Sequence, residues 1–276
     1  MTLAEALRAA AERLAARGVP DPQVDAEWLL AMALGCSRAE LALARARELT
    51  PEEEEEAAAL VTRRAAREPL AYVLGEWGFR RLTLRTDPRA LVPRPETEVL
   101  VERCLELLAG QRDPLVLDVG VGCGAIALAL ADEHAGARVR GIDVSAEALT
   151  LAGENARRTG LADRVAFELG DAAALPPGPF DLVVSNPPYV EPDEVDELEP
   201  EVRDWEPRAA LVGPDTTEAV VSGAWHRLRP GGFLVLETHV SAARDVAELL
   251  GAQGYDGRRI TLDLAGRERV VEGTRP

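Results

Sequence analysis

Apolar residues recur at helical spacing over residues 3–68, as in Leu3, Leu7 and Leu14, and glycines and prolines interrupt the pattern. The spacing predicts a small helical bundle. Five consecutive glutamates at residues 52–56 fit the solvent-exposed first turn of the last helix of this bundle, because negative charge is favourable beside the N-terminal end of the helix dipole.

Beyond the bundle, the apolar pattern shortens and then alternates between strands and helices. Short strand-like runs within residues 72–86 predict a hairpin, and a helix is expected over residues 96–108, after Pro93 and Pro95. The alternation that follows predicts a parallel sheet with helices on both faces. The last two strands leave no room for a helix between them, so we expect them to pair antiparallel. The expected strands lie near residues 114–119, 137–142, 164–169, 180–185, 232–237, 257–262 and 268–273.

The composition fits an ordinary globular protein of one large and one small domain. The chain has 276 residues, of which 47% are hydrophobic, which is enough for a substantial core. The longest uncharged apolar stretch, residues 119–131, is too short and too rich in glycine to span a bilayer. The first 17 residues are typical of an amphipathic helix and not of a secretory leader. We therefore expect a cytoplasmic protein with no membrane contact.

Charge and metal-binding residue types narrow the range of partners. A formal net charge of −17 repels nucleic acid, and no long basic run offsets it, so we expect a basic protein partner and no nucleic acid. The three cysteines, Cys36, Cys104 and Cys123, are odd in number and far apart, and the chain has three histidines. These counts argue against a disulfide framework and against a dedicated metal site.

A glycine-rich motif at residues 118–124, Asp-Val-Gly-Val-Gly-Cys-Gly, lies where a buried strand is expected to end and a helix to begin. Ligands bind at this place in open α/β sheets. Gly120 and Gly122 allow a sharp turn and the close approach of a ligand, and Gly124 allows the helix to pack closely. Nicotinamide and flavin enzymes use a similar loop with glycine-x-glycine-x-x-glycine spacing, whereas alternate glycines after Asp118 are similar to those of methyltransferases.

Two acidic residues at the ends of the following strands complete the expected cofactor site. Asp143 can accept both hydrogen bonds of a ribose diol. Asp171 is placed to meet an adenine amino group, with Ala172 against the ring. A carboxylate at position 171 also fits the alternative role of a helix N-cap.

The strongest catalytic signal is Ser185-Asn-Pro-Pro-Tyr189, directly after an apolar strand. It suits methyl transfer to a planar amide or amino nitrogen, whose delocalised lone pair is a poor nucleophile. The side-chain oxygen of Asn186 and the carbonyl of Pro187 can each accept one N–H of the substrate, and Tyr189 can pack on its flat group. Pro188, like Pro187, has no N–H that would compete. A turn that merely ends a strand is the structural alternative.

With these motifs together, the chain resembles the release-factor glutamine methyltransferase family, known as PrmC or HemK, over nearly its whole length. The shared motifs include Glu68-Pro-Leu-Ala-Tyr72 with Gly75, Leu91-Val-Pro-Arg-Pro-Glu-Thr-Glu98, Trp205-Glu-Pro-Arg-Ala-Ala-Leu211 and Asp263-Leu-Ala-Gly-Arg-Glu-Arg-Val-Val271, besides the loop and Asn186 to Tyr189.

The resemblance implies an α/β fold: a seven-stranded Rossmann-like class I methyltransferase domain at residues 96–276, a helical substrate-recognition domain at 1–70 and a hairpin linker at 71–95. It implies S-adenosyl-L-methionine as cofactor and, as substrate, the glutamine of the Gly-Gly-Gln motif of class I peptide-chain release factors. We expect transient binding of the release factor by a monomer. The implied cofactor contacts are Asp118, Gly120, Val121, Gly122, Cys123, Gly124, Asp143, Asp171, Ala172 and Asn186. The implied substrate contacts are Asn186, Pro187, Pro188 and Tyr189, and we take Asn186, Pro187 and Tyr189 as catalytic.

The chain departs from the family pattern at three places. Cys123 replaces the usual serine or threonine of the glycine loop, and we expect a buried rather than a reactive thiol. Residues 213–217 lack the usual glycine-rich pattern, and His239 stands where glycine is common. Pro93 to Pro95 are either a rigid linker or part of the site, where Thr97 would act as a cap or line the cofactor pocket.

Residues 191–206 hold nine acids against one arginine. A solvated loop is the default interpretation, and steering of a basic protein toward the site is the functional one.

Three other functions remain open from the sequence. The same chemistry fits a glutamine in another protein, such as a ribosomal protein. An adenine-N6 nucleic-acid methyltransferase would act on the same kind of planar nitrogen, but the negative net charge of the chain opposes the binding of nucleic acid. A cofactor-binding adaptor without catalysis is the third, and the intact Asn186 to Tyr189 motif argues against it.

Overall fold

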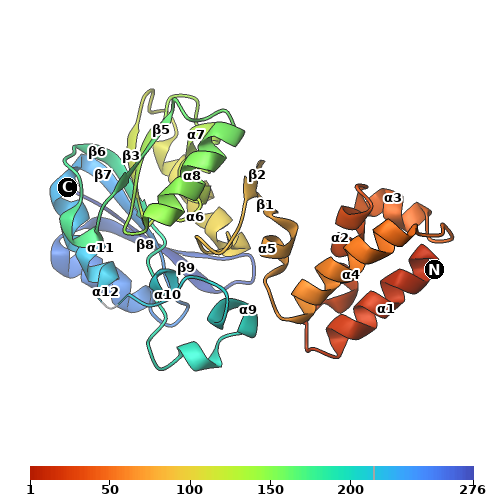
Figure 1. Cartoon of the computed structure of the whole chain (residues 1–276). Helices are drawn as coiled ribbons and strands as arrows, with labels where there is room; N and C mark the ends of the chain where they lie inside the picture. The colour runs from red at the N-terminus through yellow and green to blue at the C-terminus, as the bar shows by residue number, and fades with distance from the viewer. Residues whose placement is uncertain (214) are drawn as a thin grey trace. The chain divides into compact units, whose positions relative to one another are not determined.

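The computed structural model describes residues 1–213 and 215–276, and it divides the chain into two compact units (Figure 1). The first unit holds Met1–Gly75 together with Glu199–Trp205, and the second holds Glu76–Leu198 together with Glu206–Pro276. Pro214, within the segment 213–217 considered above, lies outside the described residues. The chain passes from one unit to the other at three points along its length.

The first unit is a helical bundle, as the apolar spacing predicts. Three of its helices begin with a capping box, at Thr2, Ser37 and Thr50, where side chain and backbone satisfy each other's polar groups. The glutamates at 52–56 lie at the start of a helix and none of them is buried, which confirms that prediction. Its helices are α1 (Leu3–Ala15), α2 (Pro22–Ala33), α3 (Arg38–Leu43), α4 (Pro51–Ala65), α5 (Leu70–Leu74) and α9 (Pro200–Arg203).

A buried arginine of α4 holds the distant segment Glu199–Trp205 in the first unit. Nε of Arg64 lies 2.7 Å from Oδ2 of Asp25, and its Nη1 lies 2.7 Å from Oε1 of Glu201. Arg67 adds a contact of 2.5 Å from its Nη2 to Oε2 of Glu201. The interpretation of residues 191–206 as a uniformly solvated loop is therefore wrong at Glu201, whose side chain is 15% exposed.

The second unit contains a short hairpin and the large sheet. The hairpin pairs β1 (Glu76–Phe79) with β2 (Leu82–Arg85), and Phe79 and Leu84 join the hydrophobic core of this unit. The hairpin predicted within residues 72–86 is present, but residues 72–74 belong to α5. The region expected as a linker thus divides, with α5 in the first unit and the hairpin in the second.

The described residues form one seven-stranded sheet in the order β5-β4-β3-β6-β7-β9-β8. The first five of these strands run parallel, and β9 is antiparallel to both of its neighbours. The predicted fold and the antiparallel final pair are confirmed. The strands are β3 (Leu115–Val119), β4 (Arg138–Asp143), β5 (Val165–Leu169), β6 (Phe180–Ser185), β7 (Leu228–Glu237), β8 (Asp256–Leu262) and β9 (Glu268–Thr274).

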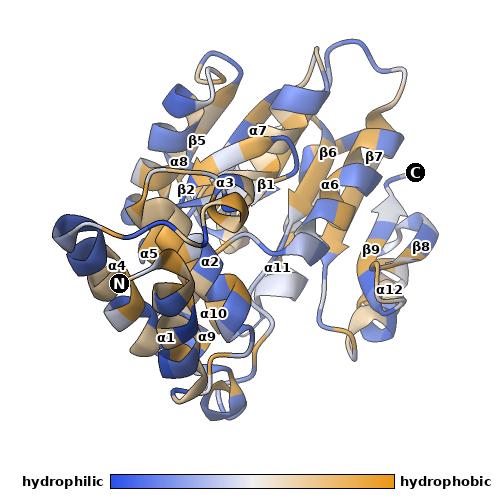
Figure 2. Ribbon diagram, turned by 90° about the vertical axis from the view of Figure 1, so that its right-hand side faces the viewer, coloured by the Kyte–Doolittle hydropathy of each residue, from blue (hydrophilic) through white to orange (hydrophobic). Residues whose placement is uncertain are grey.

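Helices cover both faces of this sheet, and the strand residues alternate between two cores (Figure 1). Val116 packs with the helices of one face and Leu117 with those of the other, as the period of two requires. Figure 2 shows hydrophobic residues gathered along β6 and β7. Helices α6 (Pro95–Leu108), α7 (Ala125–Glu133) and α8 (Ala146–Arg158) cover the first face, and α11 (Thr216–Arg227) and α12 (Ala243–Gln253) the second. The short helix α10 (Arg208–Leu211) and two 3-10 turns, η1 (Ala172–Ala174) and η2 (Val195–Glu197), complete the unit.

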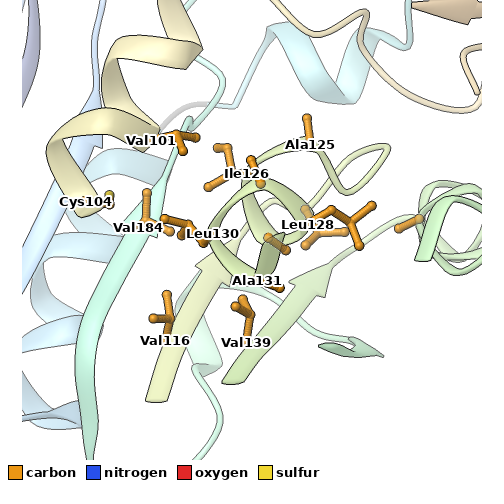
Figure 3. Close-up of a cluster of buried hydrophobic side chains, with 14 of the residues drawn as sticks. Val101, Cys104, Val116, Ala125, Ile126, Leu128, Leu130, Ala131, Val139 and Val184 are labelled. Atoms are coloured by element: carbon orange, nitrogen blue, oxygen red, sulfur yellow. The ribbon is translucent and has the colours of Figure 1, made fainter. Parts of the chain in front are cut away.

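Buried side chains of the first core gather around α7 (Figure 3). Val101 and Cys104 of α6, Val116 of β3 and Val184 of β6 surround the apolar side of α7, on which Leu130 is fully buried. This packing fixes the N-terminal end of α7 directly after the carboxyl end of β3, where the glycine loop lies.

Candidate active site

The glycine loop is fastened to the end of the neighbouring strand. The backbone nitrogens of Gly120 and Val121 both donate to the carbonyl oxygen of Ile142, at 2.9 and 3.0 Å. Gly120, Gly122 and Gly124 all have positive φ, at 79°, 54° and 90°, a region that residues with a Cβ adopt rarely. The sequence therefore places glycine where this turn requires it.

A second reason for glycine at position 124 is the close packing of its Cα against side chains of α7 and α8. A Cβ at this position would lie 3.1 Å from Cδ1 of Leu128 and 3.3 Å from Cβ of Ala152. At Gly122, by contrast, a Cβ would meet no described atom within 4 Å, so the space beside the loop is open to a ligand. The loop thus packs closely on one side and is open on the other.

Asp118 lies wholly inside the protein and is fully buried. Its Oδ2 accepts a hydrogen bond of 3.1 Å from the backbone nitrogen of Ala127 in the first turn of α7, and burial raises the pKa of Asp118 to about 7. With no exposed surface, this carboxylate supports the start of the helix. The side chains of Val121 and Cys123 are also buried, so a ligand could reach these two residues only through their backbone atoms.

Cys123 has the properties of a structural thiol. It is 4% exposed, and burial raises its pKa to about 12. Cys104 is fully buried, and burial raises its pKa as well. The prediction of a buried thiol in the glycine loop is confirmed.

Asp143, at the end of β4, is held in place by backbone groups on both sides. Its Oδ2 accepts from the nitrogen of Gly122 at 2.9 Å, and its Oδ1 accepts from that of Ser145 at 2.9 Å. Each carboxylate oxygen can accept more than one hydrogen bond, so the oriented group keeps capacity for a diol. Val144, which the sequence analysis missed, is 62% exposed beside it and offers an apolar surface to a flat ring.

Asp171 and Ala172 follow β5 and lie at a 3-10 turn. Oδ1 of Asp171 accepts from the nitrogen of Ala173 at 2.9 Å, so the capping role considered for this residue is present. Asp171 is exposed, and half-buried Ala172 packs against the second core. The cap leaves Oδ2 of Asp171 as the oxygen available to an amino group.

The loop and the proline motif meet at the carboxyl edge of the sheet. Val119 and Ser185 are register partners at the ends of β3 and β6, and the hydroxyl of Ser185 donates to the carbonyl of Val119 at 2.7 Å. As a result, a Cβ on Gly120 would lie 3.9 Å from the backbone oxygen of Asn186. The two motifs that the sequence singled out are therefore adjacent in space.

A buried acid that the sequence analysis missed lies behind Asn186. Glu237 ends β7, next to β6 in the sheet, and it is 1% exposed. Burial raises the pKa of Glu237 to about 7, although hydrogen bonds from the side chains of Thr97 and Asn186 and the charge of Arg269 act to lower it. Nδ2 of Asn186 also lies 3.4 Å from Oγ1 of Thr97. A glutamate directly after the apolar run at residues 233–236 was the signal that could have identified it.

Tyr189 borders the same site from the end of the proline motif. Its ring is half-buried and lies 6.0 Å from the ring of His239, centroid to centroid, with 43° between the planes. Burial raises the pKa of the Tyr189 hydroxyl, and the charge of Glu237 acts in the same direction. Pro187 is buried and Pro188 is half-buried, so the two prolines form one rigid side of the site.

A parallel-sheet edge with this glycine loop and proline motif defines a methyltransferase of the Rossmann-like class, and the comparisons agree. A family model described as "Methyltransferase domain" matches residues 116–205, and one described as "PrmC N-terminal domain" matches residues 5–75. Among solved structures, a 16S rRNA N2 G1207 methyltransferase (RsmC) of T. thermophilus has a TM-score of 0.53 and 22% identity, covering 73% of this chain and 50% of that one. This likeness shows the fold.

Full-length relatives give the family. A release factor glutamine methyltransferase of Caulobacter vibrioides is 40% identical over 280 residues, covering 100% of this chain and 97% of the relative. That of Deinococcus radiodurans is 43% identical over 281 residues, covering 100% and 99%. The chain belongs to the release factor glutamine methyltransferase family, and the resemblance inferred from its motifs is confirmed.

Two further observations concern partners and metals. Among the helices of residues 1–213 and 215–276, none combines the length and apolar character needed to cross a membrane. Within the same residues, no group of three or more histidine, cysteine or acidic side chains is arranged to hold a metal ion.

Proposed function

We propose that this protein transfers a methyl group from S-adenosyl-L-methionine to the side-chain amide nitrogen, N5, of the glutamine in the Gly-Gly-Gln motif of class I peptide-chain release factors. The observation that carries the proposal is the adjacency of the glycine loop and Asn186 at the carboxyl edge of the sheet, in a chain of this family. At this edge of the sheet, a cofactor held by the glycine loop can meet an amide held by Asn186.

The residues around the loop fit this cofactor. Asp143 is oriented to accept a ribose diol, and exposed Val144 and half-buried Ala172 offer apolar surface to an adenine ring. Asp171 retains one carboxylate oxygen for the adenine amino group. The open space at Gly122 allows the approach of the ligand to the backbone. When bound, S-adenosyl-L-methionine supplies an electrophilic methyl group, and transfer to the amide leaves S-adenosylhomocysteine and one proton.

The proline motif would hold the substrate glutamine. The side-chain oxygen of Asn186 and the carbonyl of Pro187 each accept one N–H of the amide, which fixes the direction of the nitrogen and stabilises positive charge on it as the N–C bond forms. The ring of Tyr189 packs on the planar amide. A strong general base is unnecessary, because the N–H becomes acidic as positive charge develops, and the proton then passes to water.

The charge of the protein suits a basic protein partner bound transiently. Exposed acids of the segment after Tyr189 include Glu191, Asp193 and Glu194, whereas Glu201 and Glu206 are engaged in ion pairs. Glu199 and Asp204 are exposed but pair with Arg67 and Arg203, so we assign the steering role to the exposed acids at residues 191–197. We infer a monomer that acts in the cytoplasm on release factors.

The test is to incubate the protein with labelled S-adenosyl-L-methionine and a recombinant class I release factor, and to locate the label by peptide mass spectrometry. The label is expected on the Gly-Gly-Gln glutamine and is expected to be absent when that glutamine is replaced. Label on a ribosomal protein or on adenine instead would overturn the substrate. Asn186→Ala is the control for catalysis: methyl transfer should be lost and cofactor binding retained, whereas an adaptor protein would show no change.

A further inference from the structure

Glu237 is a buried carboxylate that the proposed chemistry does not use. It is 1% exposed, and its Oε2 has no hydrogen-bond partner among the described residues. Leaving such an atom unpaired inside a protein is costly, so a functional reason for its presence is expected. Glu237 ends β7 beside Asn186, the residue that follows β6, so the Asn186 amide is the candidate for the group on which this carboxylate acts.

We propose that Glu237 is a positioning residue that fixes the orientation of the Asn186 side-chain amide, so that the oxygen Oδ1 faces the substrate glutamine. The proposal rests on the proposed function, because it concerns how Asn186 accepts the N–H of an amide substrate.

The two ends of a side-chain amide differ in the hydrogen bonds that they can form. Oδ1 can accept a hydrogen bond and Nδ2 can donate one, so an asparagine in the wrong orientation would present a donor to the N–H of the substrate. An ionised carboxylate accepts only, and Glu237 therefore selects Nδ2 as the end that faces it. Thr97 supports the same choice, because its Oγ1 accepts a hydrogen bond of 3.4 Å from Nδ2 of Asn186.

The position of Glu237 in the sheet brings it next to Asn186. Ser185 and Leu236 are register partners on the parallel strands β6 and β7, so the residues that follow them emerge side by side at the carboxyl edge. Thr97 reaches the same point from the first turn of α6, where it is 5% exposed. Two elements, β7 and α6, thus meet Asn186 at the end of β6.

The orientation depends on the ionisation of Glu237. Among the described residues, the charged or titratable groups that act on it are Arg269 on β9, Glu96 on α6 and Tyr189 after β6. Burial and Glu96 raise the pKa of Glu237, and Arg269 lowers it, with a result of about 7. When protonated, Glu237 can donate, and the amide of Asn186 is no longer held in one orientation. The turnover number should therefore fall as the pH falls through 7, with little change in substrate binding.

The first experiment compares Glu237→Gln with Glu272→Gln in the labelled methyl-transfer assay. Glu272 is a buried glutamate on β9 that pairs with Arg103, outside the site, so it controls for the loss of a buried charge in the same sheet. For Glu237→Gln we expect kcat to fall roughly 10- to 100-fold with KM and cofactor affinity nearly unchanged, because a small misorientation of a reacting group has effects of this size. Its pH profile should also lose the acidic limb. Glu272→Gln should keep the wild-type kcat and pH profile.

A second comparison uses Thr97. Thr97→Ser keeps the hydroxyl and should keep kcat, whereas Thr97→Val has the same shape without it and should lower kcat. The proposal would be overturned by an unchanged kcat and pH profile in Glu237→Gln, or by equal losses in Glu237→Gln and Glu272→Gln.

A measurement without substrate separates this proposal from the proposed function. The side-chain NH2 resonances of Asn186, assigned by their absence in Asn186→Ala, are followed by ¹⁵N NMR between pH 5 and 9. We expect a shift with a midpoint near 7 in the wild type and none in Glu237→Gln; the lack of a shift in the wild type would overturn the proposal. If the shift appears but no release factor is methylated, the positioning role stands and the proposed substrate falls.

Discussion

Nη2 of Arg94 lies 2.8 Å from Oε1 and 2.7 Å from Oε2 of Glu206, a contact between residues 112 positions apart in the second unit. The carboxylate of Glu206 is almost completely buried, and its pKa is raised by burial and lowered by Arg94. Arg94 belongs to the Pro-Arg-Pro segment that leads into α6, so this segment is a structural anchor and not merely a rigid linker.

Replacing Arg94 by alanine should destabilise the second unit by roughly 2–3 kcal/mol, because it leaves the Glu206 carboxylate buried without its partner. The value is below that of a fully buried pair, because the Arg94 side chain is 32% exposed. Glu206 binds its proton more tightly in the folded state than in the unfolded one, so its contribution to stability falls as the pH rises above its ordinary pKa of 4.5. The loss in Arg94→Ala should therefore be larger at about pH 8 than at about pH 5.

Urea unfolding at the two pH values measures this difference. Arg158→Ala is the matched control, because Arg158 forms an ion pair with Glu76 in which both side chains are 49% exposed. Exposed pairs contribute about 0–1 kcal/mol, so the control should change little. Equal effects of the two substitutions would show that the burial of Glu206 has no energetic consequence.

The course of the chain around Glu201 shows what the sequence could and could not reveal. Strand periodicity, with turn residues at each end, predicts the seven strands, and glycine and proline chemistry predicts the loop and Asn186. No local pattern indicates that Glu201 lies in the first unit, because its partner Arg64 is 137 residues away. Glu237 has a local signal, because it directly follows an apolar run, but its role depends on Thr97 of α6 and on Asn186 after β6, which only the folded structure brings to it.

Glu201→Gln should destabilise the first unit, although residue 201 is far from the bundle in sequence. Removing this carboxylate leaves Arg64 with Asp25 as its remaining ion-pair partner, and Asp25 carries a pKa raised by burial. A loss of roughly 1–3 kcal/mol is expected for a partly buried charged hydrogen bond. Hydrogen exchange of the amides of α4 is the measurement. The neighbouring exposed residue serves as control: Asp204→Asn should leave these amides protected, and equal exchange in Glu201→Gln and the wild type would contradict the assignment.

Gly124→Ala should weaken both folding and cofactor binding. The new Cβ meets Leu128 and Ala152 at 3.1 and 3.3 Å, and φ is 90°. Overpacking and an unfavourable φ together should cost roughly 2–4 kcal/mol. Gly160→Ala separates the two effects, because Gly160 has φ of 73° but no described atom within 4 Å of its Cβ. It should cost about 1 kcal/mol and leave cofactor affinity unchanged. Thermal unfolding and calorimetric titration with S-adenosyl-L-methionine provide the two readouts.

The native protein should show one readily reactive thiol. Cys36 is partly exposed, whereas Cys104 and Cys123 are buried and have raised pKa values, so that few thiolates form near pH 8. A thiol reagent such as 5,5′-dithiobis(2-nitrobenzoate) should modify Cys36 quickly and the other two only after unfolding. Cys36→Ser should then remove the fast phase. Rapid modification of Cys123 in the native state would contradict the structural role given to this thiol.

His239, which stands where the family usually has glycine, should assist substrate binding by supporting Tyr189. The ring centroids lie 6.0 Å apart, within the range in which aromatic pairs contribute about 0.5–1.5 kcal/mol. If the ring of Tyr189 packs on the substrate glutamine, His239→Gly should loosen that ring and raise KM for a Gly-Gly-Gln substrate by about 2- to 10-fold, the equivalent of that energy. The value of kcat should change little, because Asn186 and Glu237 remain in place.

His239→Phe keeps a ring beside Tyr189 and should keep KM within about twofold of the wild type. Steady-state kinetics of the wild type, His239→Gly and His239→Phe measure this effect. If the two variants have the same KM, the contact between the rings has no part in substrate binding.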